Sequence, residues 1–168
     1  GGLTTNNLLT GTPRPLLAPL WDDNALTATT DFTYQTNGTA GSRIFTAEWL
    51  NVKWNYNATS GCMSFQVKLY EATGVVEFVY HQLAGTLNSA SASIGITAVG
   101  TGSGNMLSLN GSGASPTVSS TTETTTIAAK PAEGLHRHQL RLLARARSPH
   151  HRRVRRGPLA VGGSAEAG

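Results

Sequence analysis

Apolar and polar residues alternate most regularly over residues 62–81 of this 168-residue chain. The alternating apolar positions are Met63, Phe65, Val67 and Leu69 in a first run and Val76, Phe78 and Tyr80 in a second. A period of two puts successive side chains on opposite faces of a strand, so each run presents one apolar face. Because a short turn at residues 71–74 separates the runs, the pattern predicts a β-hairpin from Cys62 to His81 that anchors the core.

Residues 43–56 form the longest candidate strand, and the parity of their apolar positions changes part-way along. The alternating apolar residues fall on odd positions as far as Trp49 and on even positions from Leu50 onward. A slip of one residue moves all following side chains to the other face of a sheet. The shift therefore predicts a bulge or bend near Trp49.

Shorter apolar runs, separated by Gly, Ser and Asn, predict further strands at residues 31–36, 93–98, 106–109 and 121–127. Residues 1–15 are rich in turn formers, and Pro13 and Pro15 hold the backbone extended before Leu16. No segment shows the period of an amphipathic helix. The predicted fold is all-β, an antiparallel β-sandwich of the jelly-roll or immunoglobulin-like two-sheet type.

Composition agrees with a β-protein, because Thr and the aromatic residues suit a pleated, half-buried surface while Gly and Asn supply turns. No apolar run approaches the roughly 20 residues that cross a bilayer, so no membrane span is predicted. Cys62 is the only cysteine, which excludes an intrachain disulfide. We interpret it as a small buried apolar residue.

Charge divides the chain near Gly134. Residues 1–134 hold five basic and eight acidic residues, a net charge of −3, whereas residues 135–168 hold eight arginines and one acid, a net charge of +7. The sequence predicts one β-sandwich domain over residues 1–134 and an Arg/His-rich tail over residues 135–168. Because the chain begins with two glycines and no Met, the domain is interpreted as a fragment whose true start lies upstream.

The basic tail has three readings. Clustered arginines can neutralise phosphates, but basic runs are poorly specific for that function, so nucleic-acid binding is not expected. The tail is either disordered or the product of translation in a shifted reading frame. Its composition favours the second, because Arg, His, Ala, Gly and Pro rise together in place of Thr and Val, as they do when a GC-rich gene is read out of frame. Read one base later, residues 135–138 can encode Tyr-Thr-Val-Thr, an alternating strand.

Several segments in order resemble a known family of domains. They are residues 15–23 (PLLAPLWDD), 43–49 (RIFTAEW), 65–71 (FQVKLYE) and 74–80 (GVVEFVY). Over about residues 3–134 they resemble a β-rich domain of secreted surface proteins of gliding bacteria, which are large and exported by type IX secretion. They are also similar, more distantly, to the nidogen-type extracellular domain. The resemblance implies a secreted or cell-surface location and neighbouring domains in a larger protein.

Two adjacent carboxylates are the candidate metal ligands. Asp22 and Asp23, followed by Asn24, offer the hard oxygen atoms that Ca²⁺ prefers. However, no calcium-binding loop motif surrounds them, and consecutive residues of a strand point in opposite directions. A structural turn or capping role is the competing interpretation.

Aromatic side chains are the candidate ligand-binding residues. Trp49, Trp54 and Tyr56 could form a platform on which sugar rings stack, although burial in the core is the commoner fate of strand aromatics. Glu48, Glu71 and Glu77 could supply the paired carboxylates of a glycosidase, but nothing fixes their separation, and Glu71 is expected to be a solvated turn residue. His81 is the only histidine before the tail, and no Gly-x-Ser-x-Gly motif occurs.

Three functions remain open from the sequence. The favoured one is a non-catalytic extracellular module for adhesion or structure, with a glycan or a surface protein as its partner. The second is a carbohydrate-binding module of a polysaccharide-degrading enzyme. The third is a hydrolase in its own right. No cofactor is expected other than the candidate Ca²⁺.

Overall fold

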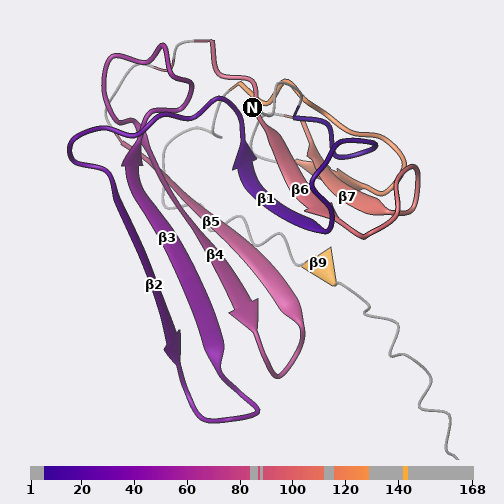
Figure 1. Ribbon diagram of the computed structural model, residues 1–168. Coiled ribbons are helices and arrows are strands. Elements are labelled where there is room, and N and C mark those ends of the chain that lie inside the picture. Colours follow the sequence, from indigo (N-terminus) through magenta and orange to yellow (C-terminus); the bar gives the residue numbers. More distant parts are fainter. Residues whose placement is uncertain (1–5, 84–86, 88, 112–115, 129–141, 144–168) are drawn as a thin grey trace, which may run out of the picture.

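Two antiparallel sheets pack together in the computed structural model, which describes residues 6–83, 87, 89–111, 116–128 and 142–143 (Figure 1). The smaller sheet has the order β1-β6-β7-β8 and the larger has the order β2-β3-β4-β5-β9. The strands are β1 (Leu16–Trp21), β2 (Asp31–Asn37), β3 (Ile44–Val52), β4 (Met63–Tyr70), β5 (Val75–Gln82), β6 (Ser93–Thr97), β7 (Met106–Asn110), β8 (Thr117–Ser119) and β9 (Leu142–Leu143). The all-β sandwich predicted from the sequence is confirmed. Among the described residues, no helix is long and apolar enough to cross a membrane.

The hairpin is confirmed as β4 and β5. Phe65 pairs with Tyr80, and Val67 pairs with Phe78. Phe65, Val67 and Phe78 are all buried on the face that points toward the smaller sheet. The tight connection between the strands uses Gly74, whose positive φ of 64° suits a residue without a Cβ.

The predicted bulge is confirmed in β3. Its pairing with β4 is regular from Ile44 to Trp49 and resumes only at Val52. Asn51 lies in the interruption with a φ of 55°, and its backbone N–H donates to Ser64 Oγ at 3.0 Å. The strand ends at Val52, earlier than predicted, because the chain turns at residues 53–57.

Residues 121–127 are the main error in the predicted strands. They contain one isolated bridge, between Ile127 and Ala92, and no ladder. This segment is held by a side chain and not by a neighbouring strand. The Glu123 carboxylate accepts hydrogen bonds from the backbone N–H groups of Leu8 and Leu9 at 2.6 and 3.1 Å. The edge strand β8 at Thr117–Ser119 was not predicted.

The main core lies between the sheets and is centred on Trp54, Phe78 and Met63. Cys62 is fully buried there, as predicted, and its sulfur accepts the backbone N–H of Trp54 at 3.2 Å. Tyr80 ties the two sheets together by donating its hydroxyl to the Pro19 carbonyl. Burial raises the pKa of Tyr80 well above its ordinary value.

Most of the basic tail lies outside the described residues. The two described residues of the tail are Leu142 and Leu143, which form β9 and pair with Val76 and Val75 of β5. The division at Gly134 and the out-of-frame reading remain predictions.

Candidate functional site

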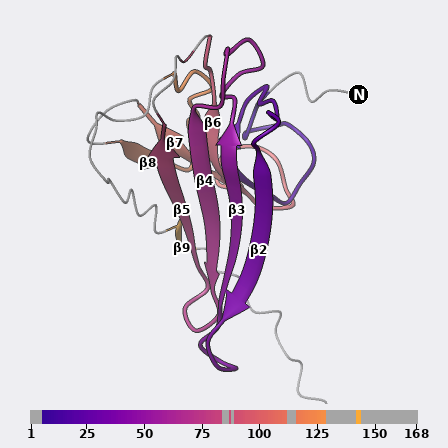
Figure 2. The same ribbon diagram turned by 90° about the vertical axis from the view of Figure 1, so that its left-hand side faces the viewer.

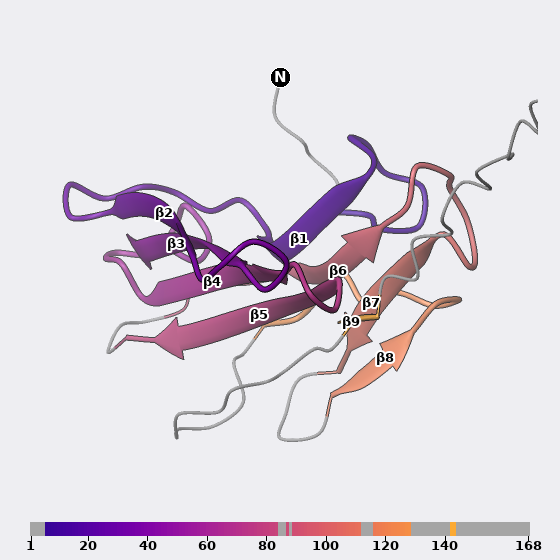
Figure 3. The same ribbon diagram turned by 90° about the horizontal axis from the view of Figure 1, so that it is seen from below.

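The larger sheet extends beyond the smaller one and leaves part of its inner face open. Figure 1 shows β2 to β5 continuing past the smaller sheet toward their connecting turns. β1 lies next to β4, where the two sheets meet (Figure 3). Figure 2 places β2 at the edge of the larger sheet opposite β5 and β9. The inner face near β2 is therefore the least covered.

Aromatic side chains line this uncovered region, and we call Phe32, Tyr34, Phe45 and Trp49 the open aromatic face. The register between β2 and β3 puts them on the same side of the sheet, since Phe32 pairs with Trp49 and Tyr34 pairs with the buried Ala47. Phe32 is 52% exposed and Tyr34 is 71% exposed. These side chains point in the same direction as core residues, but no described strand of the smaller sheet covers them.

The rings form a continuous row. The centroids of Phe32 and Trp49 are 4.9 Å apart, and Trp49 stacks on Phe65 at 5.0 Å with an interplanar angle of 19°. Phe32 and Tyr34, and Tyr34 and Phe45, are each 6.3 Å apart. These separations lie within the range of favourable aromatic contacts. The row runs from Phe45 through the exposed rings of Tyr34 and Phe32 to Trp49 and the core at Phe65.

Two hollows adjoin the open aromatic face. A cavity of about 300 Å³ between β1 and β3–β4 has Trp49 and Phe65 on one wall and Leu17 and Leu26 among its other lining residues. A second hollow of about 520 Å³ lies at the turn end of the sheet, over Phe45, Leu69 and Val76, with Arg43 and Glu71 at its border. Both have a largely apolar lining, with Asn24 as the polar residue of the first and Arg43 and Glu71 among the polar residues of the second, as ligand sites commonly do.

The candidate ligand-binding residues do not form one platform. Trp49 is part of the open aromatic face, but Trp54 is 1% exposed in the core and its ring is not available to a ligand. Tyr56 is 60% exposed and lies beyond a turn in which Asn55 has a φ of 70°. Tyr56 therefore lies outside the strand that carries Trp49.

The candidate calcium ligands have separate roles. Asp22 Oδ2 accepts hydrogen bonds from Trp54 Nε1 at 2.9 Å and from the backbone N–H of Ser91 at 2.6 Å. Asp22 Oδ1 accepts the backbone N–H of Asp23 at 2.8 Å. The carboxylate thus joins β1 to the core and to the segment before β6, whereas Asp23 is exposed. Within the described part of the chain, no three His, Cys, Asp or Glu residues are placed to share a metal ion.

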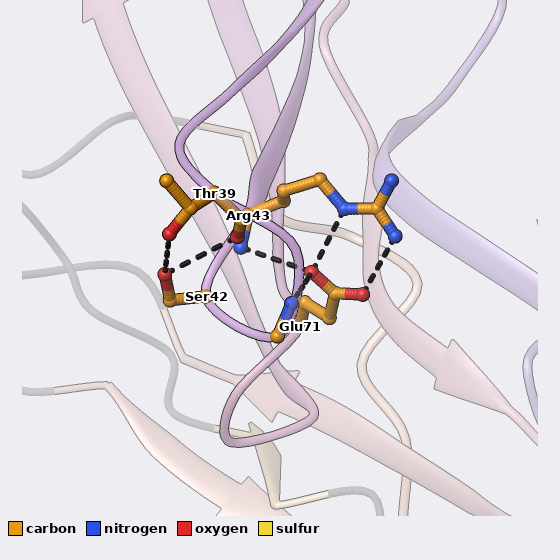
Figure 4. A network of polar contacts seen from close by, with 5 residues as sticks. Thr39, Ser42, Arg43 and Glu71 are labelled. Atoms are coloured by element: carbon orange, nitrogen blue, oxygen red, sulfur yellow. Dashed lines mark hydrogen bonds and ion pairs between the residues drawn. The ribbon is translucent and has the colours of Figure 1, made fainter.

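Glu71 is held in place, contrary to the expectation of a merely solvated turn residue. Its Oε2 accepts from the backbone N–H groups of Gly41 and Arg43 at 2.9 and 3.0 Å and from Arg43 Nε at 2.9 Å. Arg43 Nη2 donates to Glu71 Oε1 at 2.7 Å, which completes a two-point ion pair (Figure 4). Hydrogen bonds from Arg43 lower the pKa of Glu71 from 4.5 to about 2. The network fastens the β2–β3 turn to the β4–β5 turn.

The other two candidate glycosidase carboxylates also accept hydrogen bonds from protein donors. Gln66 donates to Glu48, and the Tyr70 hydroxyl donates to Glu77, which is buried. Each of the three carboxylates therefore has a structural partner. Their pairing across a scissile bond remains untested.

Sequence reasoning missed Phe32 and Tyr34 as surface residues. Their alternation with Thr33 and Gln35 is the ordinary sign of a strand with one buried face. No local signal separates an aromatic residue that has a covering sheet from one that lies beyond it.

Comparison with known proteins gives the family. Residues 1–137 match the family described as NIDO related. The chain belongs to that family. This confirms the nidogen-like part of the resemblance, and it suggests an extracellular module of structural or adhesive type. Comparisons with curated proteins and with solved structures found no match.

Proposed function

We propose that the chain is a non-catalytic extracellular module of a secreted or surface-anchored bacterial protein, exported by the type IX route, that serves adhesion or presents a neighbouring domain. The observation that carries this proposal is the NIDO-related match over residues 1–137. The open aromatic face supports it, because exposed aromatic clusters are characteristic of contact surfaces. Phe32 and Tyr34 are the residues expected to contribute most.

An adhesion assay tests this proposal. Beads that display the 168-residue chain should adhere to a protein-coated or a polysaccharide-coated surface more strongly than bare beads. Beads that carry Phe32→Ser and Tyr34→Ser should lose this adhesion, and Tyr56→Ser should retain it, because Tyr56 is exposed but outside the open aromatic face. A chain that adheres to neither surface, or that hydrolyses members of a polysaccharide panel, would contradict a non-catalytic adhesion role.

The second candidate is a carbohydrate-binding module, and the cavity beside Trp49 favours it. An aromatic ring at the wall of an apolar hollow can stack on a sugar ring, and Asn24, which also lines the hollow, can orient it. Titration calorimetry with soluble oligosaccharides should show heat for the parent chain and none for Trp49→Ala. Trp49→Phe should retain part of the binding if stacking is the cause. Tyr56→Ala is the matched control and should bind like the parent.

A further inference from the structure

Strand β2 is an open edge of the larger sheet. It is terminal in the strand order, and all seven residues from Asp31 to Asn37 are exposed. The backbone of β2 pairs with β3 on one side, and no hydrogen bond on its other side occurs within the described ranges. At the opposite edge of the sheet, by contrast, β5 has β9 beside it. An exposed edge of this kind is a template for another strand.

The usual protections of an edge strand are missing from β2. Its sequence, DFTYQTN, contains no Pro, Gly, Lys or Arg. Its pairing with β3 is continuous over seven positions, so no bulge twists the edge away. Asp31 is the only charged residue, and it is at the first position. Natural proteins generally block such edges with bulges, prolines or charges unless the edge is used.

We infer that β2 pairs with β2 of a second copy of this chain, in antiparallel register centred on Tyr34. A two-fold axis that relates the same edge of two identical sheets makes the joining strands antiparallel, and two-fold dimers are the commonest symmetric assemblies. The pairing joins the two larger sheets into one. This inference does not rest on the proposed adhesive function.

Parity fixes where the two-fold axis can pass. In a strand, the backbone N–H and C=O groups of one residue point to one neighbouring strand, and those of the next residue point to the other. Two residues that lie opposite each other in an antiparallel pair must therefore both point their backbone groups toward each other or both point them away. Residues with the same backbone direction are separated by an even number of positions. When two copies of one strand pair symmetrically, the two-fold axis must therefore pass beside a residue and not between two residues. Of the residues on which the axis could lie, Tyr34 alone is the centre of the seven-residue strand, and it brings every residue of β2 into the pairing.

Side-chain complementarity agrees with this register. Asp31 lies opposite Asn37 of the second copy, so no like charges meet, and Thr33 lies opposite Gln35. On the inner face, Tyr34 lies opposite its own symmetry mate and Phe32 lies opposite Thr36. Phe32 and Tyr34, the two most exposed rings of the open aromatic face, would then lie beside the same two rings of the second copy and form one aromatic row across the dimer.

Two double variants of the full chain test both the contact and its register. Thr33→Lys with Gln35→Lys places lysines opposite each other across the axis, whereas Thr33→Lys with Gln35→Glu places Lys opposite Glu. Both changes are at exposed positions of one strand, so circular dichroism should show the parent fold in both. Sedimentation velocity over a concentration series then measures the dimer dissociation constant.

The parent should form dimers, and the Lys/Lys variant should dissociate about tenfold or more readily than the Lys/Glu variant, because cross-strand pairs of like charge are unfavourable and those of opposite charge are favourable. A parent chain that stays monomeric at every concentration overturns the inference. Equal dissociation constants for the two variants also overturn it, because the contact would then lie elsewhere. If only an added extended peptide binds β2, the edge serves a different partner and the self-pairing is wrong.

Discussion

The covered and uncovered parts of the larger sheet carry similar side chains and have different fates. Phe65 and Phe78 are 6% and 0% exposed beneath the smaller sheet, whereas Phe32 and Tyr34, on the same face, are 52% and 71% exposed. All four residues alternate with neighbours that point to the other face. The difference comes from the layer above them, which covers β4 and β5 but does not reach β2. Alternating apolar residues are therefore enough to place side chains on one face of a sheet, but these side chains become a core only where a second layer covers them.

The two parts are also fastened differently. The covered part is held by apolar packing and by links between the sheets, among them Asp22 to Trp54 and Tyr80 to Pro19. Within the described part of the chain no second layer lies over the uncovered end, and its two turns are fastened by Glu71 and Arg43 at the surface. Burial stabilises the first, and charge-assisted hydrogen bonds stabilise the second.

The largest expected effect separates the two kinds of aromatic residue. Phe78→Ala should lower the free energy of unfolding by about 3 to 5 kcal/mol, because it leaves a cavity in the core. Phe65→Ala should cost a similar amount. Phe32→Ala should cost about 1 kcal/mol or less, because that ring is half exposed. Urea denaturation measures all three, and a large loss at Phe32 would show that the open aromatic face is covered in solution.

The next effect distinguishes two adjacent aspartates. Asp22→Ala should cost about 1.5 to 3 kcal/mol, since it removes a charged acceptor from Trp54 Nε1 and from the Ser91 backbone. Asp23→Ala should change stability by about 0.5 kcal/mol or less at an exposed site. Thermal melts of the two variants give the comparison.

The same melts test the calcium hypothesis. Both carboxylate oxygens of Asp22 already accept hydrogen bonds from protein donors, so we do not expect them to bind calcium. EDTA should therefore leave the melting temperature unchanged. A lower melting temperature in EDTA that calcium restores would show that the native state binds the ion, contrary to our expectation.

A smaller, pH-dependent effect belongs to the uncovered end. The pKa of Glu71 is lowered from 4.5 to about 2 in the fold, so its ionised form favours the native state. That stabilisation should be fully present above the unfolded pKa near 4.5 and should disappear as the pH falls toward about 2. Urea denaturation of the parent and of Glu71→Gln should give a difference at pH 7 that shrinks over this range. In an Arg43→Gln background the difference should be smaller but should not vanish, because the backbone N–H groups at positions 41 and 43 still donate to Glu71.

The smallest expected effect concerns the basic tail. If residues 135–168 are not part of the domain, deleting them should leave the melting temperature nearly unchanged, because the one strand that the described residues of the tail form, β9, is two residues long. Salt-sensitive binding to DNA, if the full chain shows any, should disappear with the eight arginines. A deletion that unfolds the protein would show that the domain extends beyond Gly134.

The sequence by itself determined the local structure of the larger sheet. The two-residue period defined the β4–β5 hairpin and its inward face, and the change of parity after Trp49 located the bulge in β3. These features depend on residues close together in the chain, where side-chain direction follows directly from backbone geometry. The same reasoning failed at residues 121–127, because Glu123 bonds a backbone segment more than 100 residues away in place of a neighbouring strand.

Only the tertiary structure decided which side chains are available for function. Trp54 and Trp49 look equivalent in the sequence, yet one lies in the core and the other at an open face. Asp22 finds its partners 32 and 69 residues away, and Glu71 finds Arg43 at a separation of 28 residues. Burial and pairing of this kind depend on how far the smaller sheet extends over the larger one, and that is set by contacts between distant parts of the chain and not by any local pattern.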